Sequence, residues 1–146
     1  MAARALGQIG SDTAVPDLLK AAWLVDTRYE AILALAAIQD TRATPVFIDA
    51  LSGSEDIETV QAAEFSLVKL GDDAINEMIE TFLITNPECP ETIKSIRICK
   101  LLGNSHNATA LATLKKILDQ EKDPEVKSCI KQQLSNNSLS DQEKKK

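Results

Sequence analysis

The sequence has few of the residues from which catalytic and metal sites are built. Its 146 residues include one histidine, His106, and five glycines that are scattered along the chain. A metal centre needs several converging His and carboxylate ligands, and a phosphate-binding loop needs a glycine-rich run. No local pattern places Ser, His and Asp together as a catalytic triad would require. The sequence therefore predicts no catalytic residue, no metal and no cofactor.

Basic runs and long apolar runs are also absent from the expected folded part. The formal net charge is −6 at pH 7 and the sequence pI is about 4.8. Such a chain lacks the positive patch that binding to a phosphate backbone requires, which excludes nucleic acid as a partner. No apolar run approaches the roughly 20 residues of a membrane span, and no signal peptide opens the chain. We expect a soluble, cytoplasmic protein with no membrane partner.

Aromatic residues are scarce as well, although apolar residues make up 44% of the chain. Ala and Leu supply most of the apolar surface, which suits close packing of helices against one another. The terminal sequence SNNSLSDQEKKK is polar and charged. A segment of this composition cannot bury enough apolar surface to fold, so residues 136–146 are predicted to be a disordered tail.

Residues 31–51, AILALAAIQDTRATPVFIDAL, contain the unit that the rest of the chain repeats. Ala31, Ala34, Leu35 and Ile38 fall at i, i+3, i+4 and i+7, which is one face of an α-helix. Asp40 or Thr41 is predicted to cap a second helix through its free N–H groups. A proline, residue 45, stands in the first turn of that helix, where a missing N–H costs little. The unit is therefore a helix, a corner and a helix.

The unit recurs at spacings of 29, 32 and 32 residues, with Ile9, Ile38, Leu70 and Leu102 in equivalent positions. A helical pair of this length cannot bury its apolar face alone, so successive pairs stack into a solenoid. The predicted fold is an all-α, right-handed superhelix of about four and a half helical pairs. Its half repeat is 1–10, with Gly10 ending the helix, and its repeats are 11–39, 40–71, 72–103 and 104–135.

The repeat alignment also gives expectations for helices and for single residues. Helices are predicted at 13–24, 27–38, 42–52, 56–70, 73–85, 90–102, 107–119 and 124–135, with Asp26 or Thr27 capping the second of them. Cys99 shares a position with Leu35 and Leu67, so we interpret it as a small buried hydrophobe without a redox or metal role. Trp23 is expected to pack between repeats, and His106 to lie in an exposed corner.

The segment A-A-R-A-L-G-Q-I-G-S-D-T-A-V-P-D-L-L, from Ala2 to Leu19, resembles HEAT repeats of the PBS lyase HEAT-like type. The pattern returns more loosely from Thr27 to Ile48, where Gln39 replaces the usual glycine, and weakly in the two repeats that follow. The resemblance covers nearly the whole of the expected folded part. The resemblance implies a HEAT/armadillo-type solenoid. Among enzymes built on similar repeats, deoxyhypusine hydroxylase holds two irons with His-Glu pairs, which a chain with His106 as its one histidine cannot match. Bilin lyases of the phycobilisome are the other enzymatic relatives that the resemblance implies.

Residues 1–10 correspond to the second helix of a repeat whose first helix is missing. Ala2, Ala3, Ala5, Leu6 and Ile9 do not provide the polar outer face that a terminal repeat normally carries. This favours a fragment of a longer array, with further repeats before Met1, over an ordinary N-terminal capping helix.

The candidate binding surface is a groove formed by the second helices, which line the concave side of HEAT solenoids. Their outward positions, at 100° per residue, form the predicted groove: Tyr29, Leu33, Ala36, Gln61, Phe65, Val68, Ile93, Arg97 and Lys100. Leu33, Phe65 and Arg97 share one column. Apolar residues continued by a basic end suit an acidic-tipped amphipathic helix or peptide. In the alternative interpretation, adjacent repeats cover Leu33 and Phe65.

These observations lead to one main hypothesis and two alternatives. The main hypothesis is a non-enzymatic scaffold that binds another protein, as a helix or peptide, on its concave face. The first alternative is a phycobilin lyase or a phycobilisome-associated, chaperone-like factor. The second is a structural fragment of a longer HEAT-repeat protein.

Overall fold

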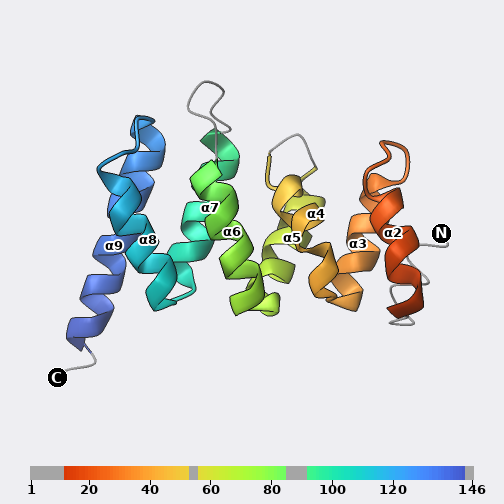
Figure 1. The fold of residues 1–146 in the computed structure, drawn as a ribbon, viewed down its shortest axis with the longest axis horizontal. Coiled ribbons are helices and arrows are strands. Elements are labelled where there is room, and N and C mark those ends of the chain that lie inside the picture. Colours follow the sequence, from red (N-terminus) through yellow and green to blue (C-terminus); the bar gives the residue numbers. More distant parts are fainter. Residues whose placement is uncertain (1–11, 53–55, 85–91, 144–146) are drawn as a thin grey trace. The chain divides into compact units, whose positions relative to one another are not determined.

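The computed structural model describes residues 12–52, 56–84 and 92–143, with side chains placed as far as residue 138. All the regular structure in these ranges is helical (Figure 1). The chain divides into two compact units, Met1–Ala74 and Ile75–Lys146, which are described separately below. The predicted all-α fold class is confirmed for the described ranges. The half repeat 1–10 and its Gly10 lie outside them.

The first unit holds two helical pairs, each introduced by a short 3₁₀ helix or a capped corner. Its elements are η1 (Asp12–Ala14), α2 (Val15–Ala21), α3 (Arg28–Ile38), η2 (Thr41–Ala43), α4 (Thr44–Ala50) and α5 (Ile57–Leu70). Helix α2 packs against α3, α4 packs against α5, and α3 lies beside α5. The core between them includes the fully buried side chains of Ile32, Leu35, Phe47, Leu51 and Leu67. Burial of one side chain of this size away from water contributes about 1.5–3 kcal/mol to the free energy of unfolding.

The second unit contains three well-packed helices after α6 (Asp72–Ile84), which starts in the first unit. They are α7 (Thr92–Asn104), α8 (Ala108–Leu118) and α9 (Pro124–Glu143), and α9 packs against both α7 and α8. The buried side chains between them include Ile98, Leu102, Leu114 and Ile130.

Two of the three caps weighed from the sequence can be compared with the structure. The Asp40 side chain accepts a hydrogen bond from the backbone N–H of Arg42 at 2.8 Å, so its prediction as a cap is confirmed. Thr27 occupies the N-cap position of α3, which is one of the two positions predicted. Its side chain makes no cap bond, and its hydroxyl donates to the carbonyl of Ala21 at 2.8 Å.

The C-terminal segment departs most from the sequence prediction. Residues 136–143 continue α9 as helix, where a disordered tail was expected. Asn137 is buried, and its amide donates to the carbonyls of Gly103 at 3.0 Å and Gln133 at 2.8 Å. Its Oδ1 lies 2.9 Å from Nδ1 of His106. Composition alone did not predict these long-range bonds, which attach the polar end of α9 to the corner after α7.

The corner after α3 holds Gln39 in the left-handed conformation, with φ 60° and ψ 44°. This is the C-terminal cap position that glycine usually fills because it has no Cβ. The Gln39 amide donates to Ser66 Oγ at 3.1 Å, and its Oε1 is buried without a partner among the described residues. Ser66 Oγ keeps its own bond to the Ala62 carbonyl at 2.7 Å.

We expect Gln39→Gly to raise the free energy of unfolding by about 1 kcal/mol, because it relieves the left-handed strain and removes the unpartnered oxygen. Urea denaturation followed by circular dichroism measures the change. Gln39→Ala is the matched control, since it loses the same side-chain bonds but keeps a Cβ. Equal stability of the two variants would show that the backbone conformation carries no strain.

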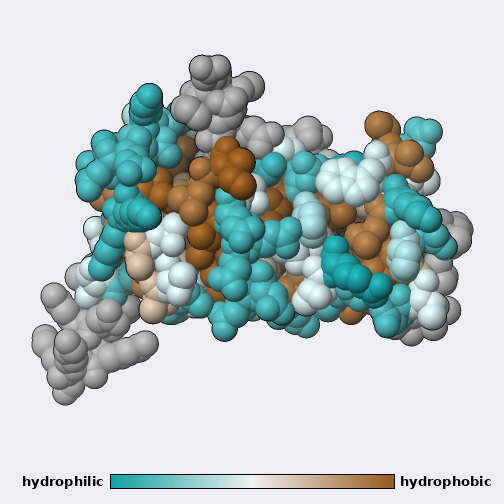
Figure 2. Space-filling view, in the orientation of Figure 1, coloured by the Kyte–Doolittle hydropathy of each residue, from teal (hydrophilic) through white to brown (hydrophobic). Residues whose placement is uncertain are grey.

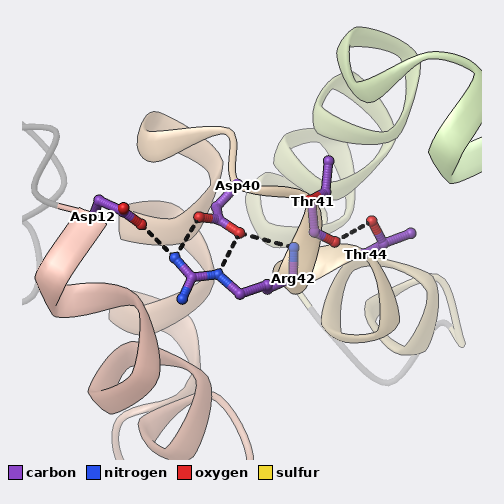
Figure 3. A network of polar contacts seen from close by, with 5 residues as sticks. All are labelled: Asp12, Asp40, Thr41, Arg42 and Thr44. Carbon is purple, nitrogen blue, oxygen red and sulfur yellow. Dashed lines mark hydrogen bonds and ion pairs between the residues drawn. The ribbon is translucent and has the colours of Figure 1, made fainter.

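A charged network ties the corner between α3 and α4 to the start of α2 (Figure 3). The Arg42 guanidinium donates to Asp40 Oδ2 at 2.7 Å and also contacts Asp12. Thr44 Oγ1 donates to the carbonyl of Thr41 at 2.7 Å in the same turn. The hydrogen bonds from Arg42 hold the pKa of Asp40 below its usual value. The network therefore joins two successive repeats through their corners.

This pKa shift predicts how the stability of the first unit depends on pH. Asp40 has a lower pKa in the folded than in the unfolded chain, so it stabilises the fold above about pH 4 and less as pH falls through the folded pKa. Wild type should therefore be more stable than Arg42→Gln at pH 7, and the difference should shrink below pH 4. Urea denaturation midpoints of the two proteins, measured at pH 7 and again below pH 4, test this expected difference. A difference that did not change with pH would contradict the assigned role of Asp40.

Candidate partner-binding face

Helices α3 and α5 each bury one side and present the opposite side to solvent. Helix α3 buries Ala31, Ile32, Ala34 and Leu35, whereas α5 buries Thr59, Val60, Ala63, Ser66 and Leu67. Six of the predicted groove residues lie on the other sides. We call them the outward face of the first unit: Tyr29, Leu33, Ala36, Gln61, Phe65 and Val68.

The outward face is most apolar at its α5 end. The exposed fraction is 58% for Phe65 and 64% for Val68, which is unusual for large apolar side chains. Gln61 and Tyr29 are exposed, and Leu33 and Ala36 are half-buried. Phe65 is therefore exposed and Leu33 is partly covered. The alternative in which an adjacent repeat covers Phe65 stays a prediction, because the repeat that follows α5 belongs almost wholly to the second unit.

One hydrogen bond and one ring contact organise this face. The Tyr29 hydroxyl on α3 donates to Glu58 Oε2 on α5 at 2.6 Å. The Lys69 ammonium lies 4.9 Å from the centroid of the Phe65 ring. This distance is within the range of a cation–π contact. The two ends of the face therefore differ in charge. The Glu58 carboxylate lies beside Tyr29 at one end, and the Lys69 ammonium lies beside Phe65 at the other.

The remaining three predicted groove residues lie on α7 of the second unit. Ile93 and Lys100 are exposed, and Arg97 is half-buried. A continuous column running from Leu33 through Phe65 to Arg97 stays a prediction, because the two units are described separately.

The connection between α2 and α3 carries an exposed apolar tip that sequence analysis did not single out. Trp23, Leu24 and Val25 are consecutive, and their exposed fractions are 55%, 60% and 92%. Apolar side chains are visible at this end of α2 and α3 in Figure 2. The expectation that Trp23 packs between repeats is wrong, because its ring stands in solvent with the Arg28 guanidinium 5.8 Å from the centroid. A run of three apolar residues directly after a helix end is the signal that could have revealed the tip.

The chemistry-bearing side chains of the second unit are mostly structural. Cys99 is fully buried, as predicted from its repeat position, and Cys129 is buried beside it. The Cys129 thiol donates to the carbonyl of Ile96 at 3.8 Å. Interaction with Cys129, together with burial, raises the pKa of Cys99, and interaction with Cys99 lowers the pKa of Cys129. His106 is exposed in a corner, as expected, and has a φ of 53°.

Across 12–52, 56–84 and 92–138, no group of three or more His, Cys, Asp and Glu side chains is placed to hold a metal ion. Within the same part of the chain, the helices are all too short or too polar to cross a membrane.

The fold is that of a helical-repeat protein, and within the first unit two helical pairs stack through their second helices, α3 and α5. The sequence family described as PBS lyase HEAT-like repeat matches residues 1–22 and 27–53. The match covers about a third of the chain, over the segments in which the sequence motifs are clearest, and the later repeats are not matched. No curated protein matches the chain.

Proposed function

We propose that this protein is a non-enzymatic interaction scaffold that holds a helix or peptide of another protein on the outward face of its first unit. The observation that carries the proposal is the pair of exposed apolar side chains, Phe65 and Val68, on a helix whose opposite side is fully buried. Contiguous apolar surface of this kind is typical of protein-binding sites. Stacked helices also supply the extended surface on which repeat proteins bind partners.

The energetics favour this face as a site of association. Full burial of a Phe or Val side chain in an interface contributes about 1.5–3 kcal/mol to the free energy of association. Rigid aromatic residues commonly dominate binding energy at interfaces. Phe65 is attached to a helix that is fixed by Val60, Ala63 and Leu67 in the core. It therefore offers a preorganised anchor that loses little conformational freedom on binding.

Photo-crosslinking tests the proposal directly. A photoreactive phenylalanine analogue placed at residue 65 should form a covalent adduct with one partner in cell extract. The same analogue at Gln132, an exposed position on α9, is the matched control and should not form that adduct. A second full-chain variant, Val68→Glu with the analogue still at 65, should lose the adduct while keeping its helicity. Identical adducts from 65 and 132, or none at all, would contradict the proposal.

A role connected with a phycobilin lyase is the second candidate, and the name of the matching repeat family supports it. Co-expression with the linear tetrapyrrole would then give a protein fraction with visible absorbance. The scaffold proposal predicts no such absorbance.

A further inference from the structure

The net negative charge of the chain comes from the first unit. Residues 1–74 contain twelve acidic and five basic residues, which gives a net charge of −7 at pH 7. Residues 75–146 contain ten acidic and eleven basic residues, which gives +1 with His neutral. The overall charge of −6 therefore hides a strong asymmetry between the unit that carries the outward face and the unit that follows it.

Most of the basic side chains in the first unit are already engaged. Three of them form ion pairs, which are Arg28 with Asp49 at 2.8 Å, Arg42 with Asp40 at 2.7 Å and with Asp12, and Lys20 with Asp17 at 3.7 Å. A fourth, Lys69, lies over the Phe65 ring. The carboxylates that are not paired with one of these cations therefore set the electrostatic potential around the outward face.

Three such carboxylates gather at the start of α3 and α5, and we call them the acidic rim: Glu30, Asp56 and Glu58. Among the described residues, no ion pair joins any of them to a basic side chain. All three act on Tyr29 of the outward face. The hydrogen bond to Glu58, partial desolvation and the charges of Glu58, Asp56 and Glu30 raise the pKa of the Tyr29 hydroxyl. The acidic rim therefore borders the face directly.

Helix capping accounts for only one of the three carboxylates. Asp56 is the N-cap of α5, and its Oδ1 accepts from the backbone N–H groups of Glu58 and Thr59 at 3.0 and 3.1 Å. Glu30 and Glu58 accept no backbone hydrogen bond within the described part of the chain. Both stand in the first turn of their helices, where a negative charge is favourable. Since neither forms a cap bond or an ion pair with a described residue, their remaining oxygens can meet a cation at the Tyr29 end of the face.

We infer that the partner segment is a cationic amphipathic helix, which packs apolar side chains on Phe65 and Val68 and places Lys or Arg against Glu30 and Glu58. This inference rests on the proposed function, because it names the partner of the same face. Charge complementarity at the rim of an interface selects the partner and raises the rate of association. The acidic-tipped partner expected from the sequence depended on Arg97 and Lys100, which belong to the second unit.

A peptide-display selection on the full chain tests the chemistry of the partner. The probe is a library of random 14-residue segments, selected on wild type and counter-screened on Phe65→Ala/Val68→Ala, which removes the apolar anchors without changing the charge. Segments that depend on Phe65 and Val68 should be enriched in Lys and Arg. Their affinity should fall about tenfold on Glu30→Gln/Glu58→Gln. It should stay unchanged on the control Glu80→Gln/Glu125→Gln, which neutralises two exposed carboxylates of the second unit.

The outcomes separate the two proposals. Segments that need Phe65 and Val68 but are neutral or acidic would overturn the cationic partner and leave the binding face standing. The same conclusion would follow if both pairs of Gln substitutions weakened binding equally, since the attraction would then come from net charge alone. If no selected segment depended on Phe65 and Val68, the proposed function would fail together with the inference.

Discussion

Phe47→Ala is expected to lower the free energy of unfolding by about 3–5 kcal/mol, the range typical of truncating a large core side chain. Phe47 on α4 is fully buried in the first unit, where α4 packs against α5. The substitution removes an aromatic ring and leaves a cavity that the surrounding helices fill only in part. The change is measured by urea denaturation followed by far-UV circular dichroism.

Phe65→Ala is the matched control because it removes the same ring from an exposed position. Its expected cost is below about 1 kcal/mol, since surface substitutions seldom disturb packing. The pair separates the two roles that phenylalanine has in this protein, one in the core and one on the outward face. Similar costs for both substitutions would show that Phe65 is buried in solution and would remove the basis of the proposed binding face.

Gly103→Ala is expected to lower the free energy of unfolding by about 1–3 kcal/mol through overpacking. A Cβ at residue 103 would lie 2.6 Å from the Cβ and 2.7 Å from the Cγ of Gln133, so α7 and α9 would have to move apart. The Gly103 carbonyl also accepts the amide of Asn137, so the same shift would strain that bond. Urea denaturation measures the loss.

A double-mutant cycle with Gln133→Gly identifies the cause. The second substitution clears the space that the new methyl group needs, so the cost of Gly103→Ala should be smaller in that background than in wild type. Gly71→Ala provides a contrast, because a Cβ there would meet no heavy atom within 4 Å but would have to adopt a φ of 67°. The loss of unfolding free energy caused by Gly71→Ala should be the same in wild type and in the Gln133→Gly background. Additivity of Gly103→Ala and Gln133→Gly would exclude steric conflict between them.

Much of the fold follows from local signals in the sequence. Apolar residues at helical spacing predicted α3 and α5 to within two residues. Asp40 marked the start of η2, and the prolines at 16 and 45 marked the starts of α2 and α4. These signals work because capping and the geometry of proline depend on neighbours within a single turn. The buried position of Cys99 followed from the same periodicity.

Other features depended on contacts between residues that are far apart in the chain. The polar end of α9 is helical because Asn137 reaches Gly103, 34 residues earlier. Trp23 is exposed because the connection after α2 turns away from the core, which no periodicity at the helix end indicated. The Thr27 hydroxyl, at the N-cap of α3, donates to the carbonyl of Ala21 six residues earlier and makes no cap bond.

The sequence by itself determined that the chain is built from helical pairs, where most of those pairs start and end, and which side of each helix is apolar enough to be buried. Only the tertiary structure decided that Phe65 is exposed, that the Tyr29 hydroxyl meets Glu58, and that Glu30, Asp56 and Glu58 lie near the Tyr29 end of the outward face. The reason is physical. Helix formation and capping are decided within a few residues, whereas exposure and charge clustering depend on the register in which one helix packs beside another.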